Sequence, residues 1–139
     1  MKLTASDALA LATSHREAAK AVGDYLYGQW TNLSKADRER LRSIDITLLN
    51  LATDLVTQAV GVALDDAKSN LDQLTSATRA AKAAYKKVAS AKQAISIATA
   101  LIGLAAAIPT GNVAGTVAAL QKLRKVVADS AATPATPKN

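Results

Sequence analysis

The sequence predicts an all-α protein: an elongated antiparallel bundle of three to four helices with coiled-coil-like packing and a C-terminal apolar helical hairpin. Apolar residues recur every three or four positions in nearly every segment, which is the spacing of one helix face. Alanine dominates and phenylalanine is absent, so the β-branched and aromatic runs that are typical of strands are missing. Turn signals occur only near residues 30, 65–70 and 110.

The first helix is expected over residues 6–29, with Ser6 and Asp7 as candidate N-caps because their side chains can accept a hydrogen bond from a free backbone N–H. Its apolar stripe has helical spacing throughout. The members of this stripe are Ala8, Leu11, Ala12, Ala18, Ala19, Val22, Tyr25 and Leu26.

The clearest amphipathic pattern follows Ser34, which is expected to cap a second helix. Leu41, Leu48 and Leu55 repeat at seven-residue intervals within a sustained three-four spacing. We expect a thin bundle to leave this leucine stripe partly uncovered. The stripe therefore predicts a homo-oligomer or a helical protein partner.

No proline interrupts residues 34–107, so the sequence leaves open whether this stretch is one helix or two. A turn in the polar run 65–70 is favoured, because a single helix would be about 110 Å long at about 1.5 Å per residue. A Pro-Thr-Gly-Asn turn then precedes a last helix over residues 113–129. We expect one helical domain, residues 1–130, followed by a mobile low-complexity tail of Ala, Thr and Pro, residues 131–139.

Charge is distributed unevenly along the chain. Residues 1–72 carry eight Lys/Arg and ten Asp/Glu, whereas residues 73–128 carry eight Lys/Arg and no acidic residue. A purely cationic stretch indicates an anionic partner such as a membrane surface, and a solvated face that keeps the protein soluble is the alternative. The candidate residues for binding an anionic surface are Arg79, Lys82, Lys86, Lys87 and Lys92, of which the first three share one helix face.

Residues 93–121 contain no charged side chain. The leg over residues 94–108 would be roughly 22 Å long against about 30 Å of hydrocarbon, so neither leg of this hairpin is expected to span a bilayer unaided. The alternatives are a hairpin packed into protein, with small residues allowing close helix contact, and a hairpin that dips into a membrane. The hairpin residues singled out are Ile95, Leu101, Ile102, Gly103, Leu104, Ile108 and Gly115.

Nothing in the sequence points to catalysis. The chain has one His and no Cys, and it carries no phosphate-binding, metalloprotease or nucleophile-elbow motif. The acidic residues within 65–72 lack the spacing of a calcium loop. We therefore expect no enzyme activity, no cofactor, no metal and no small-molecule substrate. A partly buried structural role is expected for His15, and a modest pH switch near neutrality is the alternative. Tyr25, Tyr27 and Trp30 are expected to close one end of the bundle, and an interfacial belt is the alternative for these aromatic residues.

Long amphipathic helices followed by an uncharged hairpin, over residues 34–120, resemble helical pore-forming toxins. The Ala-rich helical composition is also similar to phasins, which coat apolar granules. The first resemblance implies membrane activity, and the second implies binding to an apolar surface.

These observations predict a non-enzymatic helical interaction or assembly protein that binds itself, a protein partner or an anionic apolar surface. The alternative is a membrane-active protein, pore-forming-like or peripheral, that uses the hairpin over residues 94–120. A nucleic-acid-binding helical protein is a lesser alternative, because only Tyr85 interleaves the basic run. We expect a cytoplasmic or peripherally membrane-associated location, since Asp7 interrupts the apolar stretch that a Sec signal peptide would need.

Overall fold

The computed structural model describes residues 2–63 and 71–132. This part of the chain is all-α, which confirms the predicted fold class, and it has five α-helices rather than three or four. Two short 3-10 helices, η1 and η2, follow α1 and α4. The elements are α1 (Ala5–Gly28), η1 (Trp30–Asn32), α2 (Lys35–Gln58), α3 (Leu71–Ala84), α4 (Ala91–Ala107), η2 (Ile108–Thr110) and α5 (Val113–Ala132).

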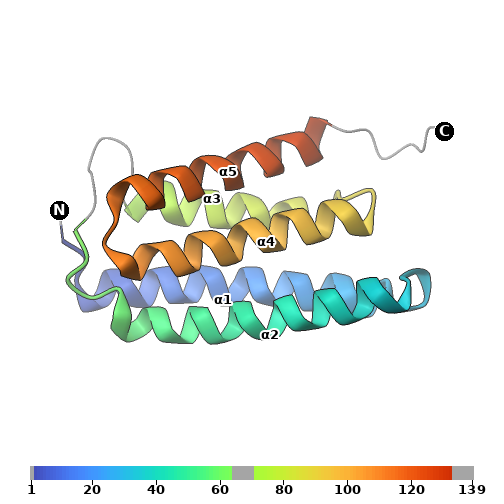
Figure 1. Ribbon diagram of the computed structural model, residues 1–139, viewed down its shortest axis with the longest axis horizontal. Helices are drawn as coiled ribbons and strands as arrows, with labels where there is room; N and C mark the ends of the chain where they lie inside the picture. Colours follow the sequence, from blue (N-terminus) through green and yellow to red (C-terminus); the bar gives the residue numbers. More distant parts are fainter. Residues whose placement is uncertain (1, 64–70, 133–139) are drawn as a thin grey trace.

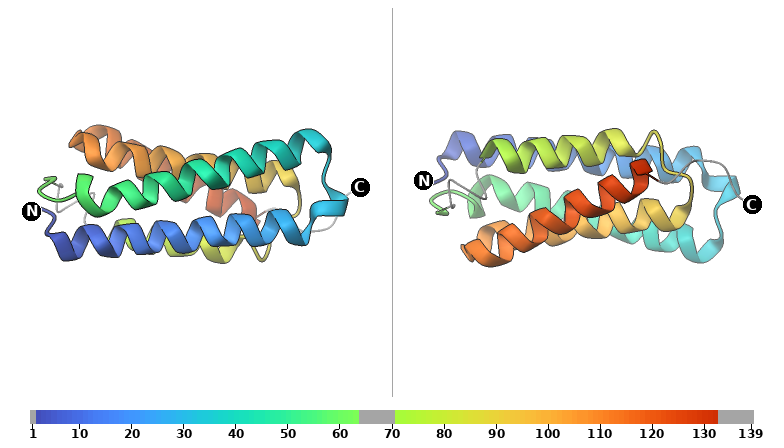
Figure 2. Two further views of the ribbon diagram at one scale, coloured as in Figure 1. Left: turned by 90° about the horizontal axis from the view of Figure 1, so that it is seen from below. Right: turned by 90° about the horizontal axis from the view of Figure 1, so that it is seen from above.

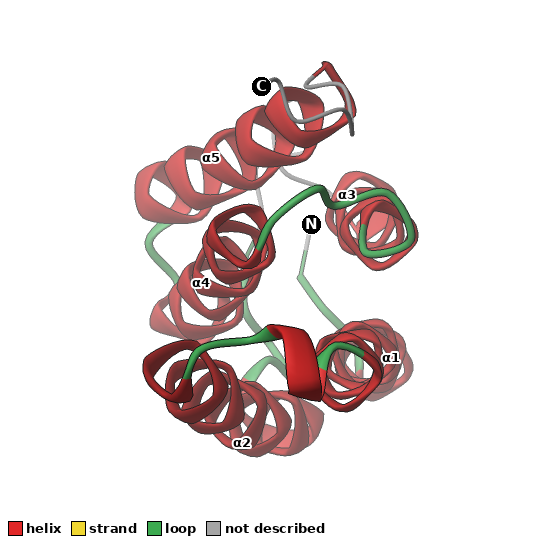
Figure 3. Ribbon diagram, turned by 90° about the vertical axis from the view of Figure 1, so that its right-hand side faces the viewer, coloured by secondary structure: helices red, strands yellow, loops and turns green. Residues whose placement is uncertain are grey.

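The helices are arranged in layers. α1 and α2 form an antiparallel hairpin, α3 packs on α1, and α4 packs on α2 (Figure 1). α5 crosses over α4 and α3 and contacts both, on the side away from α1 and α2 (Figure 3). Seen from below, α1 and α2 lie in front of the other helices, so no described helix covers their outer face (Figure 2, left).

Capping residues set where the first two helices begin. The Thr4 hydroxyl accepts from the backbone N–H of Asp7 at 3.1 Å, and the Asp7 carboxylate accepts from the N–H of Thr4 at 2.9 Å. The prediction of Ser6 or Asp7 as the N-cap was wrong, because Asp7 is the second partner of a capping box. Ser34 caps α2 as predicted and accepts from the N–H of Asp37 at 3.1 Å.

The long proline-free stretch contains three helices, α2, α3 and α4. From the sequence we expected either one helix or two. The favoured turn at 65–70 lies outside the described residues. A second break, over residues 85–90, was not predicted and accounts for the additional helix. There the Ser90 hydroxyl accepts from the N–H of Gln93 at 3.3 Å, while the Gln93 side chain accepts from the N–H of Ala89 at 2.7 Å. These bonds satisfy free backbone donors and begin α4.

The predicted C-terminal hairpin is formed by α4, η2 and α5. Gly111 ends η2 with φ +72°, a left-handed conformation that glycine adopts without strain. The Asn112 side chain then accepts from the N–H of Gly115 at 3.0 Å and starts α5. α5 continues to Ala132, past the predicted end at 129, and the remainder of the predicted tail lies outside the described residues.

The leucine stripe of α2 is completely covered. Leu41, Leu48 and Leu55 have no exposed surface, because α1 packs against one side of α2 and α4 against the other. Our expectation that this stripe stays partly open for a partner was wrong. Any interaction surface must therefore be sought elsewhere on the bundle.

Candidate functional site

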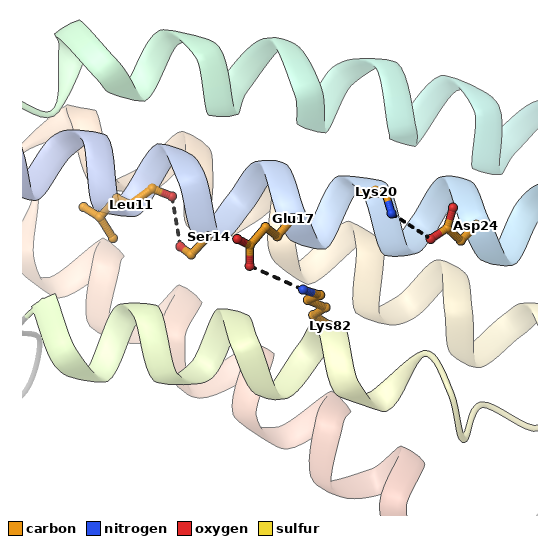
Figure 4. Close-up of polar contacts among 6 residues, drawn as sticks. All are labelled: Leu11, Ser14, Glu17, Lys20, Asp24 and Lys82. Atoms are coloured by element: carbon orange, nitrogen blue, oxygen red, sulfur yellow. Dashed lines mark hydrogen bonds and ion pairs between the residues drawn. The ribbon is translucent and has the colours of Figure 1, made fainter.

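Two of the five predicted anionic-surface residues, Arg79 and Lys82, belong to α3, and Lys86 lies in the turn directly after it. The Lys82 ammonium lies 3.4 Å from the Glu17 carboxylate of α1 (Figure 4). Arg79 lines a hollow on one side of this ion pair and Lys86 lines a hollow on the other. Because about half of each partner is exposed, the pair contributes little to stability, but it reduces the charge that Lys82 offers to another anion.

The hollow beside Lys86 has a volume of about 360 Å³ and lies between α1 and α3. The rings of Tyr25 and Tyr85 line it, with their centroids 6.0 Å apart. The Tyr85 hydroxyl donates to the carbonyl of Ala94 on α4 at 2.7 Å, and burial raises the pKa of Tyr85, so this phenol stays protonated. On the rim, Lys20 lies 3.8 Å from Asp24 (Figure 4).

The other two predicted cations do not line either of these hollows. Lys87 is exposed in the connection between α3 and α4. Lys92, in the first turn of α4, lines a separate hollow of about 220 Å³ together with Asp129 of α5. α3 ends at Ala84, before Lys86, so the prediction that Arg79, Lys82 and Lys86 share one helix face was wrong for Lys86.

The large side chains of the predicted hairpin are covered. Leu101, Leu104 and Ile108 have no exposed surface. Ile95 and Ile102 are half-buried and pack against the same core. The hairpin is therefore part of the bundle in this structure, as the first of the two sequence-based alternatives describes.

Gly103 and Gly115 do not bring helices into close contact. A Cβ atom added at Gly103 would meet no atom within 4 Å, and Gly103 is exposed. At Gly115 the nearest atom would be Cγ of Asn112, at 3.4 Å, which belongs to the cap of the same helix. Our interpretation of these small residues as a close helix contact was wrong for both glycines.

One helical run among the described residues, Ala91–Thr110, is long and apolar enough to cross a membrane by length and composition. It has 20 residues and a mean hydropathy of 1.6, and 44% of its most apolar window is buried in the bundle. At about 1.5 Å per residue this run is about 30 Å long, which matches the hydrocarbon thickness of a bilayer. The leg of roughly 22 Å expected from the sequence was therefore too short. The core helix of a bundle meets the same criteria, so length alone does not choose between these two interpretations.

The exposed large apolar side chains lie on a different face, which the sequence analysis missed. Within residues 2–63 and 71–132, six large hydrophobic side chains are exposed, and all of them belong to α1, α2 or the turns that follow these helices. They are Leu9, Tyr27, Trp30, Ile46, Leu49 and Val60. This outer α1–α2 face is the surface that no other described helix covers (Figure 2, left).

A preformed aromatic stack lies at the end of this face where α1 connects to α2. The rings of Tyr27 and Trp30 are nearly parallel, at 15°, with centroids 5.7 Å apart. The Arg38 guanidinium lies 4.9 Å from the centroid of the Trp30 ring, and its Nε donates to the Trp30 carbonyl at 2.7 Å. Tyr27 and Trp30 thus do not close the bundle end as we predicted. Only Tyr25 packs inward, against the core.

A shallow groove of about 500 Å³ runs between α1 and α2 on the same face. Tyr27 and Leu49 line it, together with Arg16 on α1 and Asp45 on α2. Burial, and the nearby negative charge of Asp24, raise the pKa of Asp45. A cation supplied by a partner would offset the negative charge of Asp24 and favour the ionised form of Asp45.

His15 has no access to solvent or to a ligand. Its Nδ1 lies 2.9 Å from the carbonyl oxygen of Leu11, and its buried Nε2 has no hydrogen-bond partner. Desolvation lowers the pKa of His15 below 6.5, so the ring is neutral at neutral pH. Over the described residues, no three His, Cys, Asp or Glu side chains gather as metal ligands would.

No protein-family model, no curated protein and no solved structure matches the chain.

Proposed function

We propose that this chain is a non-enzymatic helical interaction or assembly protein, a bundle with coiled-coil-like packing that binds its partner through the outer α1–α2 face. The single observation that carries the proposal is that all six exposed large apolar side chains of the described residues belong to α1, α2 or the turns that follow these two helices. Apolar surface that no other helix covers gains free energy when a partner removes it from water. A cytoplasmic or peripherally membrane-associated location accompanies the proposal.

The chemistry of this face supports protein binding. Trp, Tyr and Arg are the residue types most enriched among the side chains that dominate binding energies, and Tyr27, Trp30 and Arg38 form one stack here. Because Arg38 also binds the Trp30 carbonyl, the stack is held in place before a partner arrives, which lowers the entropic cost of binding. The groove lined by Leu49 continues the apolar surface along the helices.

Site-specific photocrosslinking tests this proposal. We would place a benzophenone amino acid at Leu49 or Tyr27 on the proposed face, and at the exposed Ser76 of α3 as the matched control. In the cell that makes the protein, we expect protein adducts from the first two positions and none from the control. Equal adducts at Ser76, or none anywhere, would contradict the proposal.

The second candidate is a membrane-active protein, pore-forming-like or peripheral, that uses α4 and α5. It is favoured by the 20-residue apolar run and by the absence of charge over residues 93–121. It ranks second because Leu101, Leu104 and Ile108 are buried, so α4 would have to leave the bundle before these side chains could meet lipid.

A further inference from the structure

We propose that the occupant of the outer α1–α2 face is a second copy of this chain, related to the first by a two-fold axis that lies in the plane of the interface, perpendicular to the helices at the level of Leu49. In this arrangement α1 packs antiparallel on α1 of the second copy, and α2 packs antiparallel on α2. The inference rests on the proposed function, because it assigns a partner to the same face. Three properties of the face support it: register, charge and apolar content.

One close approach shows which residues of α1 stand opposite which residues of α2. A Cβ atom added at Gly23 would lie 3.4 Å from Oδ2 of Asp45, so these two residues stand opposite each other. Because α1 and α2 are antiparallel, Leu49 stands near Ala19 and Lys20, which line the same groove. An axis at this level therefore crosses α1 between Arg16 and Asp24.

Arg16 and the acidic residues of the groove lie on opposite sides of this axis. Arg16 is three residues from Ala19 on one side and Asp24 is five residues from it on the other, with Asp45 opposite Gly23. Lys20 lies near the axis itself, 3.8 Å from Asp24 of its own helix. The rotation brings Arg16 of each copy to the acidic pair of the other copy, twice in one interface. That arrangement brings a cation to the half-buried Asp45, whose pKa is raised by burial and by the Asp24 charge, and it fixes an antiparallel orientation.

The apolar ends of the face are also exchanged by the rotation. Leu9 and Val60 lie at one end of the hairpin, and Tyr27 and Trp30 lie at the other. Antiparallel packing places Leu9 of each copy near Trp30 of the other, and Leu49 near its own symmetry mate. Each of the two helices is about 36 Å long and about 10 Å wide, so the face offers a contact area of roughly 700 Å² per copy. A standard stable interface buries about 800 Å² per partner, which is a similar area.

Single-cysteine cross-linking tests the position of the axis, because the chain contains no cysteine. With a short bismaleimide, Leu49→Cys should give a covalent dimer, since a residue on a two-fold axis lies close to its own copy. Ser76→Cys, equally placed on an exposed helix surface of α3, is the control and should stay monomeric. No dimer from Leu49→Cys, or equal yields from both variants, would overturn the proposal.

A charge exchange tests the orientation. Arg16→Glu and Asp24→Lys each place like charges together twice across the interface, so each variant alone should self-associate at least about tenfold more weakly than wild type. Both positions are exposed, and circular dichroism of each variant checks that it stays folded. An equal mixture of the two variants should recover association near the wild-type level, because each contact then joins opposite charges. If the single variants associate as strongly as wild type, or if their mixture does not regain association, the antiparallel two-fold dimer is refuted.

Failure of the dimer is distinguishable from failure of the proposed function. If wild type sediments as a monomer at about 1 mM while benzophenone at Leu49 captures a different protein, the face binds partners but the second copy is not its occupant. If wild type is a monomer and no adduct forms, both proposals fail.

Discussion

At the scale of single residues, His15 carries an ionisable ring into the interior of the bundle. One ring nitrogen is satisfied by the Leu11 carbonyl, and the other has no hydrogen-bond partner. The pKa shift of His15 has only two causes, burial and this backbone hydrogen bond, so no charged group compensates a proton on the ring. Protonation would therefore place an unpaired charge in the core, which is costly.

The first prediction concerns pH. The pKa of His15 is lowered in the folded state, so below about pH 6.5 the unfolded chain binds a proton that the folded chain does not. Stability should be fully present above pH 6.5 and should fall as the pH decreases towards 5.5, by at most about 1.4 kcal/mol per pH unit. Urea unfolding at pH 7.5 and 5.5 measures the change. His15→Leu should flatten this dependence, and wild type that is equally stable at both pH values would contradict the prediction.

The second prediction uses two adjacent leucines with opposite environments. Leu48 is fully buried, whereas 38% of Leu49 is exposed. Leu48→Ala should lower the free energy of unfolding by about 2–5 kcal/mol, because it leaves a cavity in the core. Leu49→Ala should cost less than about 1 kcal/mol in a monomer and act on association instead. Denaturant unfolding below the concentration of self-association separates the two effects, and equal losses would show that the buried face of α2 is misassigned.

At the scale of the elements, local hydrogen-bonding signals decided which helix boundaries could be predicted. Ser34 and the Pro109–Asn112 turn were recognised because their residue types interrupt the apolar spacing. The break over residues 85–90 has no glycine or proline, so its residues look compatible with a continuous helix. Ser90 followed by Gln93 is nevertheless a capping signature, and it was the available signal for the start of α4.

The third prediction compares two glycines of the same hairpin. Gly103→Ala replaces an exposed helical glycine that has free space around its Cβ position, so it should stabilise the protein by about 0.5–1 kcal/mol. Gly111→Ala forces alanine to φ +72° and should destabilise the protein by about 1 kcal/mol or more. Thermal unfolding of the two variants should therefore shift in opposite directions. A loss of stability in Gly103→Ala would mean that this glycine packs against another helix after all.

At the scale of the whole molecule, the sequence indicates which residues belong to a helix but not which face a neighbouring helix will cover. The strongest apolar stripe, on α2, was covered, and so were the large residues of the hairpin. On the exposed side, the apolar residues Leu9 of α1 and Ile46 and Leu49 of α2 are separated by charged and polar residues. Such scattered apolar residues do not predict a docking surface from the sequence alone. The surface is recognised only when the positions of α3, α4 and α5 show that these helices leave it uncovered.

The last prediction decides between the outer face and the hairpin. Membrane insertion of α4 would uncover α2, and each fully buried leucine that is exposed costs about 1.5–3 kcal/mol. Attraction to an anionic surface contributes about 1 kcal/mol per cation, and Lys82 is already paired with Glu17. We therefore expect a polarity-sensitive NBD dye on Gly103→Cys to keep its aqueous emission when anionic vesicles are added at low salt. The same dye on Ser76→Cys controls for nonspecific adsorption. A blue shift at position 103 alone, lost in high salt, would instead identify a protein that inserts its hairpin into membranes, because only lipid could surround that exposed face of α4.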